Sequence, residues 1–143
     1  PRALMFSNSA AIYDAVYSFK DYADESERLR ALIAERSPGA STLLDVACGT
    51  GKHLEQLRSW YEVSGVDLDP ELLGIARERL GDVDLRTGDM TDFALDGQFD
   101  VVTCLFSSIG YVGTVERLGS AITAMATHLN PGGVLIVEPW LTP

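Results

Sequence analysis

The chain has 143 residues, of which 46% are hydrophobic, so it is long and apolar enough to bury a core. Its formal net charge of −10 repels phosphate backbones, which argues against DNA or RNA as the main partner. The sequence has no apolar run near the roughly 18 residues that a membrane span needs, and its start lacks the pattern of a signal peptide. We therefore expect a cytoplasmic protein without a membrane partner.

The pattern of apolar residues along the sequence predicts an alternation of helices and strands. The predicted helices cover residues 10–19, 21–36, 52–60, 70–80 and 114–129. The predicted strands cover residues 42–47, 62–67, 83–86, 99–106 and 134–137. Asp69 suits the N-cap of the fourth helix because Pro70 follows it, and Asn130-Pro131-Gly132-Gly133 is expected to separate the fifth helix from the last strand. The alternation is typical of an α/β fold, a Rossmann-like parallel sheet with helices on both faces.

One glycine-rich turn lies at the centre of this pattern. The first strand ends at Ala47, Cys48-Gly49-Thr50-Gly51 follows, and a helix with Leu54 and Leu57 on one face begins directly after it. Glycine accepts positive φ angles and lets a ligand approach the backbone, and the start of a helix presents free N–H groups. Two glycines alone are also compatible with a tight turn that binds nothing. The loop is therefore a candidate ligand site that needs support from other residues.

That support comes from the residues that follow the other strands, because ligands of parallel α/β sheets lie beyond the carboxyl ends of the strands. Asp67 ends the second strand, 16 positions after Gly51, where a carboxylate can accept hydrogen bonds from both hydroxyls of a ribose. A solvated aspartate at a strand end is the alternative. Asp89 and Met90 follow the third strand, and Phe106 ends the fourth. All these residues are expected at one edge of the sheet.

The spacing of the loop distinguishes between cofactors. NAD is bound by a motif with a third glycine, which lets helix and strand pack closely around a pyrophosphate. Leu54 occupies that position here, so we expect a ligand with a ribose and a polar group near the loop but no pyrophosphate. S-adenosylmethionine meets these conditions, and an NAD-dependent dehydrogenase is the disfavoured alternative.

Several motifs, in this order, resemble those of class I S-adenosylmethionine-dependent methyltransferases. The stretch 45–51 resembles their first motif, Val66-Asp67-Leu68 their second, Gly88-Asp89-Met90 their third and Phe99-Asp100-Val101-Val102 their fourth, while residues 129–135 are similar to the lead-in to their fifth strand. The resemblance implies one S-adenosylmethionine-binding methyltransferase domain over residues 1–143, with N-terminal helices over 10–36 and a sheet core over 40–140. Sheets of this family have two further strands, so the chain is expected to hold a core that lacks the last two.

The resemblance also implies a role for each residue of the cofactor site. Gly49 and Gly51 would pass under the methionine part of S-adenosylmethionine beside the Ala47 backbone, and Asp45 would orient the loop or meet the ligand ammonium through water. Asp67 would take the ribose hydroxyls. The other expected contacts are Leu68 against the adenine, Asp89 on its amino group, the Met90 N–H on a ring nitrogen, Leu105 and Phe106 over the methionine and sulfonium, and Tyr22 on the methionine carboxylate.

A narrower resemblance lies partly outside these motifs. Tyr13-Asp14 and the stretches 20–23, 88–93, 106–111 and 137–140 look like those of N,N-dimethyltransferases of nucleotide-linked amino sugars. The implied partner is a small-molecule substrate, a dTDP-linked amino sugar methylated on its amino group. A methyltransferase for another small molecule and a non-catalytic S-adenosylmethionine-binding fragment are the alternatives. The exposed edge of the last strand is expected to favour self-association, which leaves a homodimer open.

Tyr13 and Tyr111 are the predicted catalytic residues, because a tyrosine can accept a hydrogen bond from an amine and present an electron-rich face to a cation. A helix-packing role is the alternative for Tyr13. His53 is expected on the surface of its helix, and no residues have the spacing of a metal site. Cys48 and Cys104 are expected to be buried thiols, with a disulfide as the alternative.

Overall fold

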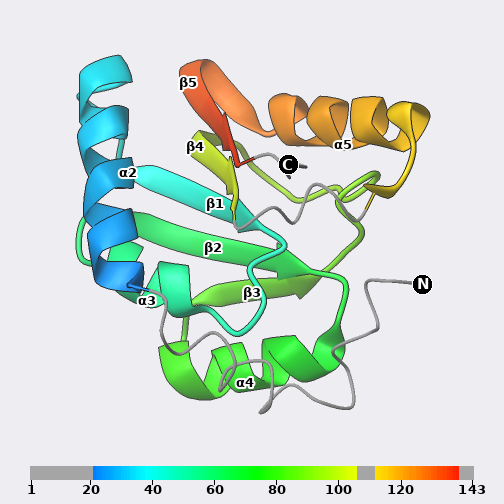
Figure 1. Cartoon of the computed structure of the whole chain (residues 1–143), viewed down its shortest axis with the longest axis horizontal. Helices are drawn as coiled ribbons and strands as arrows, with labels where there is room; N and C mark the ends of the chain where they lie inside the picture. The colour runs from blue at the N-terminus through cyan, green and yellow to red at the C-terminus, as the bar shows by residue number, and fades with distance from the viewer. Residues whose placement is uncertain (1–20, 106–111, 139–143) are drawn as a thin grey trace.

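A computed structural model of the chain describes residues 21–105 and 112–138. The predicted helix over 10–19 and the segment 106–111 lie outside the described residues. The described strands are β1 (Thr42–Val46), β2 (Glu62–Asp67), β3 (Asp84–Thr87), β4 (Phe99–Cys104) and β5 (Leu129–Val137). They pair in parallel as one sheet in the order β3-β2-β1-β4-β5 (Figure 1). The chain therefore runs outward from β1 to β3 and then returns to pair β4 with β1, which puts the topological switch beside the carboxyl end of β1.

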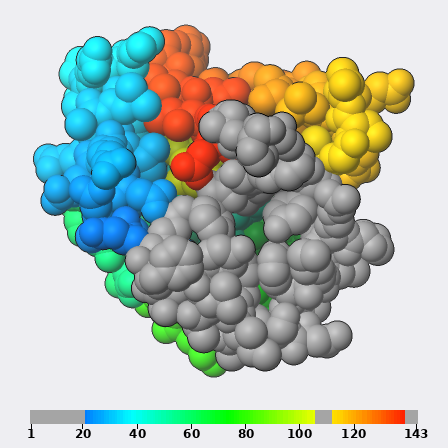
Figure 2. Space-filling model, in the orientation of Figure 1, coloured from blue at the N-terminus to red at the C-terminus, as the bar shows by residue number. Residues whose placement is uncertain are grey.

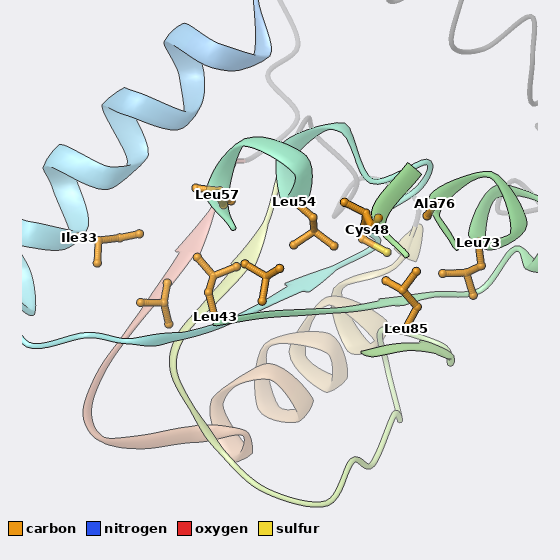
Figure 3. Close-up of a cluster of buried hydrophobic side chains, with 11 residues drawn as sticks. Ile33, Leu43, Cys48, Leu54, Leu57, Leu73, Ala76 and Leu85 are labelled. Atoms are coloured by element: carbon orange, nitrogen blue, oxygen red, sulfur yellow. The ribbon is translucent and has the colours of Figure 1, made fainter. Parts of the chain in front are cut away.

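Helices cover both faces of this sheet, as predicted. The helices are α2 (Tyr22–Arg36), α3 (Lys52–Leu57), α4 (Pro70–Leu80) and α5 (Val115–Thr127). One buried cluster joins α2, α3 and α4 to one face of the sheet, and Figure 3 shows it extending from Ile33 of α2 past Leu43 of β1 to Leu73 of α4. A second cluster joins α5 to the other face through Ala121 and Met125. Strands such as β1 and β4 contribute apolar side chains to both clusters, because successive residues of a strand point to opposite faces of the sheet.

Local signals fix the boundaries of α4. The carboxylate of Asp69 accepts hydrogen bonds from the N–H groups of Glu71 at 2.9 Å and Leu72 at 3.4 Å, and Pro70 is the first residue of the helix. Gly81 follows the last turn with φ +71°, a value that favours glycine. The prediction of Asp69 as the N-cap is confirmed, and this cap holds the start of α4 beside the carboxyl end of β2.

The start of β5 is the main correction to the predicted elements. Residues 130–133 were expected to form a loop, but β5 begins at Leu129, and Leu129 pairs with Phe99 while Val134 pairs with Val101. The extra residues form a bulge in which the Asn130 side-chain amide donates to the Asp100 carboxylate at 3.0 Å. A Cβ on Gly133 would lie 2.9 Å from the Asp100 carbonyl oxygen, so the close approach of the two backbones requires glycine there.

Smaller differences occur at other ends of the elements. Helix α3 ends at Leu57 rather than near residue 60, and β4 ends at Cys104 rather than at 106. The far edge strand β5 is only partly buried over most of its length, and its atoms form part of the surface between α2 and α5 (Figure 2). Among the described residues, no helix is long and apolar enough to cross a membrane.

Candidate functional site

The loop between β1 and α3 adopts an unusual backbone conformation. Ala47, Gly49 and Gly51 all have positive φ angles, of 61°, 58° and 83°. A positive φ in alanine costs about 1–2 kcal/mol, and such strain concentrates at ligand-binding loops. The loop is held in place by two backbone hydrogen bonds, from the Cys48 N–H to the Val66 carbonyl and from the Gly51 N–H to the Cys48 carbonyl, each at 3.1 Å.

The two glycines of the loop serve different purposes. A Cβ on Gly49 would meet no atom of the described residues within 4 Å, so among these residues Gly49 leaves open space in which a ligand can approach the backbone. A Cβ on Gly51 would lie 2.8 Å from Leu80 Cδ1 and 3.3 Å from Ala76 Cβ, both on α4. Gly51 therefore allows α4 to pack against the loop, and Gly49 forms the open part of the cradle.

Asp67 joins this loop to the next strand. Its Oδ2 accepts a hydrogen bond from the Gly49 N–H at 2.8 Å, and its Oδ1 accepts one from the Asp69 N–H at 2.8 Å. The residue is 9% exposed, so it is not the solvated strand-end aspartate considered above. Burial raises the pKa of its carboxyl, while these two backbone bonds lower it. An ionised carboxylate can accept about four hydrogen bonds, so Asp67 keeps capacity for a ligand hydroxyl.

Asp45 is a second buried carboxyl at this edge, with 2% exposure. It pairs across the sheet with Thr103 of β4, whose hydroxyl donates to Asp45 Oδ1 at 2.8 Å. Burial raises the pKa of Asp45 to about 7; the Thr103 hydrogen bond lowers it, and the nearby Asp67 carboxylate raises it further. Asp45 and Asp67 are neighbouring carboxyls whose ionisation is disfavoured. A cationic ligand group beside them would stabilise their ionised forms, so this site favours the binding of a cation.

Asp89 follows β3 in a more open setting. Its Oδ1 accepts from the Thr91 N–H at 2.9 Å and from the Thr91 hydroxyl at 2.7 Å, and its Oδ2 lies 3.7 Å from Arg117 Nη2. The Thr91 N–H bond is the main cause of a lowered pKa, and Arg117 adds to it. Met90 beside it is partly buried against the cluster under α5. The Gly88 N–H donates to the Asp67 carbonyl at 3.0 Å, which connects the ends of β2 and β3.

His53 corrects the sequence-based expectation, because it is buried and not on the surface of its helix. It is 8% exposed, its ring packs edge-on against Tyr22 at 4.8 Å between centroids, and its Nε2 lies 3.6 Å from Glu25 Oε1. Lys52 Nζ lies 5.4 Å from the centre of the Tyr22 ring. The docking of α2 onto α3 therefore brings Tyr22 to the start of α3, beside the glycine loop. This contact comes from a distant segment of the chain, which is why the local pattern did not reveal the burial of His53.

The remaining predicted residues divide into two groups. Leu68 directly follows Asp67 with 37% exposure, and Leu105 follows β4 and is buried. Tyr13, Phe106 and Tyr111 lie outside the described residues, so their contacts stay predictions.

Cys48 and Cys104 are both buried free thiols, which confirms the expectation that they are buried thiols rather than a disulfide. Within residues 21–105 and 112–138, no group of three or more His, Cys, Asp or Glu side chains could hold a metal ion.

Comparison with known proteins adds a family to this geometry. Residues 43–133 match the model of a family described as a methyltransferase domain. The chain is 47% identical over 137 residues to a dTDP-3-amino-3,4,6-trideoxy-α-D-glucopyranose N,N-dimethyltransferase of Streptomyces venezuelae, covering 94% of this chain and 58% of that protein. It is 44% identical to a dTDP-4-amino-2,3,4,6-tetradeoxy-D-glucose N,N-dimethyltransferase of Saccharopolyspora spinosa, covering 94% of this chain and 55% of that protein.

Solved structures agree with these matches. The crystal structure of Streptomyces venezuelae DesVI superposes with a TM-score of 0.90 at 47% identity, over 94% of this chain and 58% of that one. The structure of CalS10 with bound S-adenosylmethionine, an amino pentose methyltransferase from Micromonospora echinaspora, gives a TM-score of 0.88 at 44% identity, over 92% of this chain and 57% of that one. The chain thus spans a little over half the length of these relatives. The resemblance to class I S-adenosylmethionine-dependent methyltransferases is confirmed, and the chain belongs to the methyltransferase-domain family.

Proposed function

We propose that residues 1–143 form the cofactor-binding domain of an S-adenosylmethionine-dependent N-methyltransferase that acts on the amino group of a dTDP-linked amino sugar. The observation that carries the proposal is the Asp67 carboxylate, held at 2.8 Å from the N–H of the open residue Gly49. This arrangement places an acceptor for ribose hydroxyls directly beside a backbone cradle. The substrate class is supported by the relatives at 44–47% identity, whose names specify dTDP-amino sugars.

The described residues fit the proposed cofactor electrostatically. S-adenosylmethionine, when bound, supplies a methyl group on a sulfonium and also carries an ammonium. Burial raises the pKa of both Asp45 and Asp67, and the Asp67 carboxylate raises that of Asp45 further, so a cation beside them would favour their ionised forms. Asp45 is assigned to orient the loop and face the ammonium, and Ala47 and Gly51 shape the backbone around Gly49.

The other binding roles extend along the edge of the sheet. Asp89 is assigned to the adenine amino group, because its Oδ2 makes a long contact of 3.7 Å with Arg117 Nη2, whereas its Oδ1 already accepts two hydrogen bonds from Thr91. The Met90 N–H and the exposed Leu68 side chain are assigned to the adenine ring. Tyr22, the first residue of α2, lies beside the start of α3 and is assigned to the methionine carboxylate. Leu105 and Phe106 are assigned to the methionine and sulfonium region.

Two tyrosines complete the proposed mechanism. The amine nitrogen would form a bond to the methyl carbon in line as that carbon's bond to the sulfonium sulfur breaks, leaving a neutral thioether, and the nitrogen would then release a proton to solvent. This displacement needs orientation more than a strong base, so the chain's task is to hold the amine and exclude water. Tyr13 and Tyr111 are proposed to accept a hydrogen bond from the amine. If this is correct, Tyr111→Phe will lower turnover by about tenfold while leaving cofactor affinity nearly constant. A loss of affinity with unchanged turnover would assign Tyr111 to binding instead.

The proposed substrate is a class of sugars, the dTDP-linked amino sugars, rather than one sugar. Two relatives act on 3-amino sugars and one on a 4-amino sugar, so the position of the amine is open. A cytoplasmic enzyme without a nucleic-acid or membrane partner is proposed, as the acidic composition suggests. A homodimer remains a prediction, supported by the partly exposed edge strand β5.

Calorimetric titration of the chain with S-adenosylmethionine, S-adenosylhomocysteine and NAD tests the cofactor assignment. We expect binding of the two adenosyl ligands and none of NAD. Methyl transfer is then tested on the intact protein with dTDP-linked 3-amino and 4-amino sugars, with mass spectrometry to count the methyl groups. Cofactor binding without transfer to either sugar would favour another small-molecule substrate, and absence of cofactor binding would refute the proposal.

A further inference from the structure

Arg117, in the first turn of α5, contacts two loops at the carboxyl edge of the sheet. Its Nε–H donates to the Val112 carbonyl at 3.0 Å, in the segment between β4 and α5. Its Nη2 lies 3.7 Å from Asp89 Oδ2, in the loop after β3. Figure 1 shows the start of α5 on the same side of the molecule as the ends of β2 and β3. One side chain therefore connects segments that are more than twenty residues apart in the sequence.

The two oxygens of Asp89 are used differently. Oδ1 already accepts two hydrogen bonds from Thr91, one from its N–H and one from its hydroxyl. Oδ2 faces Arg117 Nη2 at 3.7 Å, a contact that adds to the Thr91 N–H bond in lowering the pKa of Asp89 and is longer than a full hydrogen bond, so this oxygen keeps lone-pair capacity for a ligand. Oδ2 is thus the atom of Asp89 that can accept a hydrogen bond from a ligand.

The geometry of the guanidinium makes this contact directional. Its five N–H donors lie in one rigid plane, so the bond from Nε to Val112 also fixes where Nη2 points. The Arg117 backbone is itself fixed, because its N–H donates to the Thr114 hydroxyl at 3.1 Å in the N-cap of α5. The side chain is 52% exposed and Asp89 is 32% exposed, so the pair contributes little to stability. Its value lies in position rather than in folding energy.

We propose that Arg117 is a positioning residue that aims Asp89 Oδ2 at the amino group of the adenine and ties the loop after β3 to the segment before α5. This inference rests on the proposed function, since it assumes an adenosyl ligand at this edge. Arg117 itself makes no bond to the ligand. Its effect is to keep an ionised acceptor in one direction, and a charged acceptor makes a stronger hydrogen bond than a neutral one.

The test measures dissociation constants for two ligands, S-adenosylhomocysteine and its analogue with hydrogen in place of the adenine 6-amino group. We expect Arg117→Gln to weaken S-adenosylhomocysteine by about fivefold and to leave the analogue within twofold of its wild-type value. Arg117→Lys is expected to recover part of the loss, because an ammonium can attract Asp89 but cannot bond Val112 at the same time. Arg86→Gln is the matched control, because Arg86 also pairs with an exposed aspartate, Asp84 within β3, at 2.7 Å.

The outcomes separate the inference from the function on which it rests. A fall in the preference for the amino-bearing ligand, seen in Arg117→Gln and not in Arg86→Gln, supports the positioning role. Equal weakening of both ligands, or no weakening of either, overturns it while the proposed function stands. Failure of the wild-type protein to bind S-adenosylhomocysteine overturns the proposed function and this inference together. The melting temperature of each ligand-free variant shows whether it folds, and Arg117→Lys carries the test if Arg117→Gln does not.

Discussion

Asp67 at the end of β2 and Asp89 just after β3 are both assigned to the cofactor, yet the two aspartates are built into the protein differently. Asp67 is almost completely buried, and its Oδ2 accepts the Gly49 N–H of the β1–α3 loop while its Oδ1 accepts the Asp69 N–H two residues further along the chain. Asp89 is one-third exposed and is held by Thr91 of its own loop and by an exposed arginine. The first aspartate is therefore part of the fold as well as of the site. The second can change with little effect on the fold.

The helices beside these loops show the same contrast. Helix α4 buries Leu72, Leu73, Ala76 and Leu80 along its length. Helix α5 buries only Ala121 and Met125, and Val115 in its first turn is 85% exposed. The first turns of α5, which include Arg117, are therefore exposed and do not pack against the core. We expect substitutions near the β1–α3 loop to affect stability and binding together, and substitutions near the start of α5 to affect binding with a much smaller effect on stability.

Gly51→Ala should have the largest effect on stability. The substitution places a side chain at φ +83° and brings its Cβ to 2.8 Å from Leu80, which is buried. Backbone strain and overpacking together should lower the free energy of unfolding by roughly 3–5 kcal/mol. Denaturant titration monitored by circular dichroism measures the loss.

Glycines in open helix positions provide the control for this substitution. Gly74 in α4 and Gly119 in α5 have no atom within 4 Å of an added Cβ and have ordinary helical φ angles. Alanine at either position should raise stability by about 0.5–1 kcal/mol, because glycine lowers helix stability. If Gly51→Ala were as stable as Gly74→Ala, the packing of α4 against the loop would not depend on glycine.

Asp45 should make stability depend on pH. Its folded pKa of about 7 lies above the value of about 3.9 in an unfolded chain, so the folded state holds a proton that the unfolded state releases between these values. Stability should therefore fall as the pH rises from about 4 to 7, by roughly 3–4 kcal/mol in full. The groups around Asp45 are Thr103 of β4, which donates to it, and Asp67 of β2, whose charge repels it.

Asp45→Asn isolates this effect from the other carboxyls. The amide is neutral at every pH, so the difference in unfolding free energy between the wild type and this variant should change between pH 5 and 8 in favour of the wild type at low pH. The pKa of Asp89 is lowered and that of Asp100 is lowered to about 2, so these two groups reduce stability only when the pH falls into the acidic range. Both proteins contain them, so their effect cancels in the difference between the wild type and Asp45→Asn. A difference that is constant over this range would mean that Asp45 is ionised throughout.

Asp67→Ala should weaken S-adenosylmethionine binding by about 2–4 kcal/mol, because two charge-assisted hydrogen bonds to the ribose would be lost. The hydrogen bonds to the Gly49 and Asp69 N–H groups are lost as well, so stability should also fall. Calorimetric titration and thermal unfolding measure the two effects. Unchanged affinity would exclude the ribose assignment, and unchanged stability would contradict the difference drawn here between Asp67 and Asp89.

Much of this organisation could be predicted from local patterns. The parallel order of helices and strands follows from the alternation of apolar segments, the start of α4 from Asp69 with Pro70, and the position of Asp67 from its place at a strand end. These features depend on residues close in sequence. The cofactor roles assigned to them remain predictions.

The features that the sequence did not reveal depend on contacts between distant segments. The early start of β5 depends on the bulge in that strand, where Asn130 bonds Asp100 of β4. The burial of His53 depends on the docking of α2 on α3. The bond from the Gly49 N–H to Asp67 and the reach of Arg117 to Asp89 depend on how neighbouring strands are registered. No spacing within one segment encodes such contacts.

Thr114→Ala should have the smallest effect and probes the start of α5 directly. The Thr114 hydroxyl caps the helix by accepting the Arg117 N–H at 3.1 Å, in an exposed position, and losing such a cap costs about 1 kcal/mol. Asp69→Ala removes the buried cap of α4, which accepts two N–H groups, and should cost more because the orphaned donors are shielded from water. Thr114→Ser keeps the hydroxyl and should match the wild type. Urea unfolding of the three variants compares the two caps. If Thr114→Ala proved as destabilising as Asp69→Ala, the start of α5 would be as tightly built as α4, and Arg117 would belong to the folded core rather than to an adjustable edge of the site.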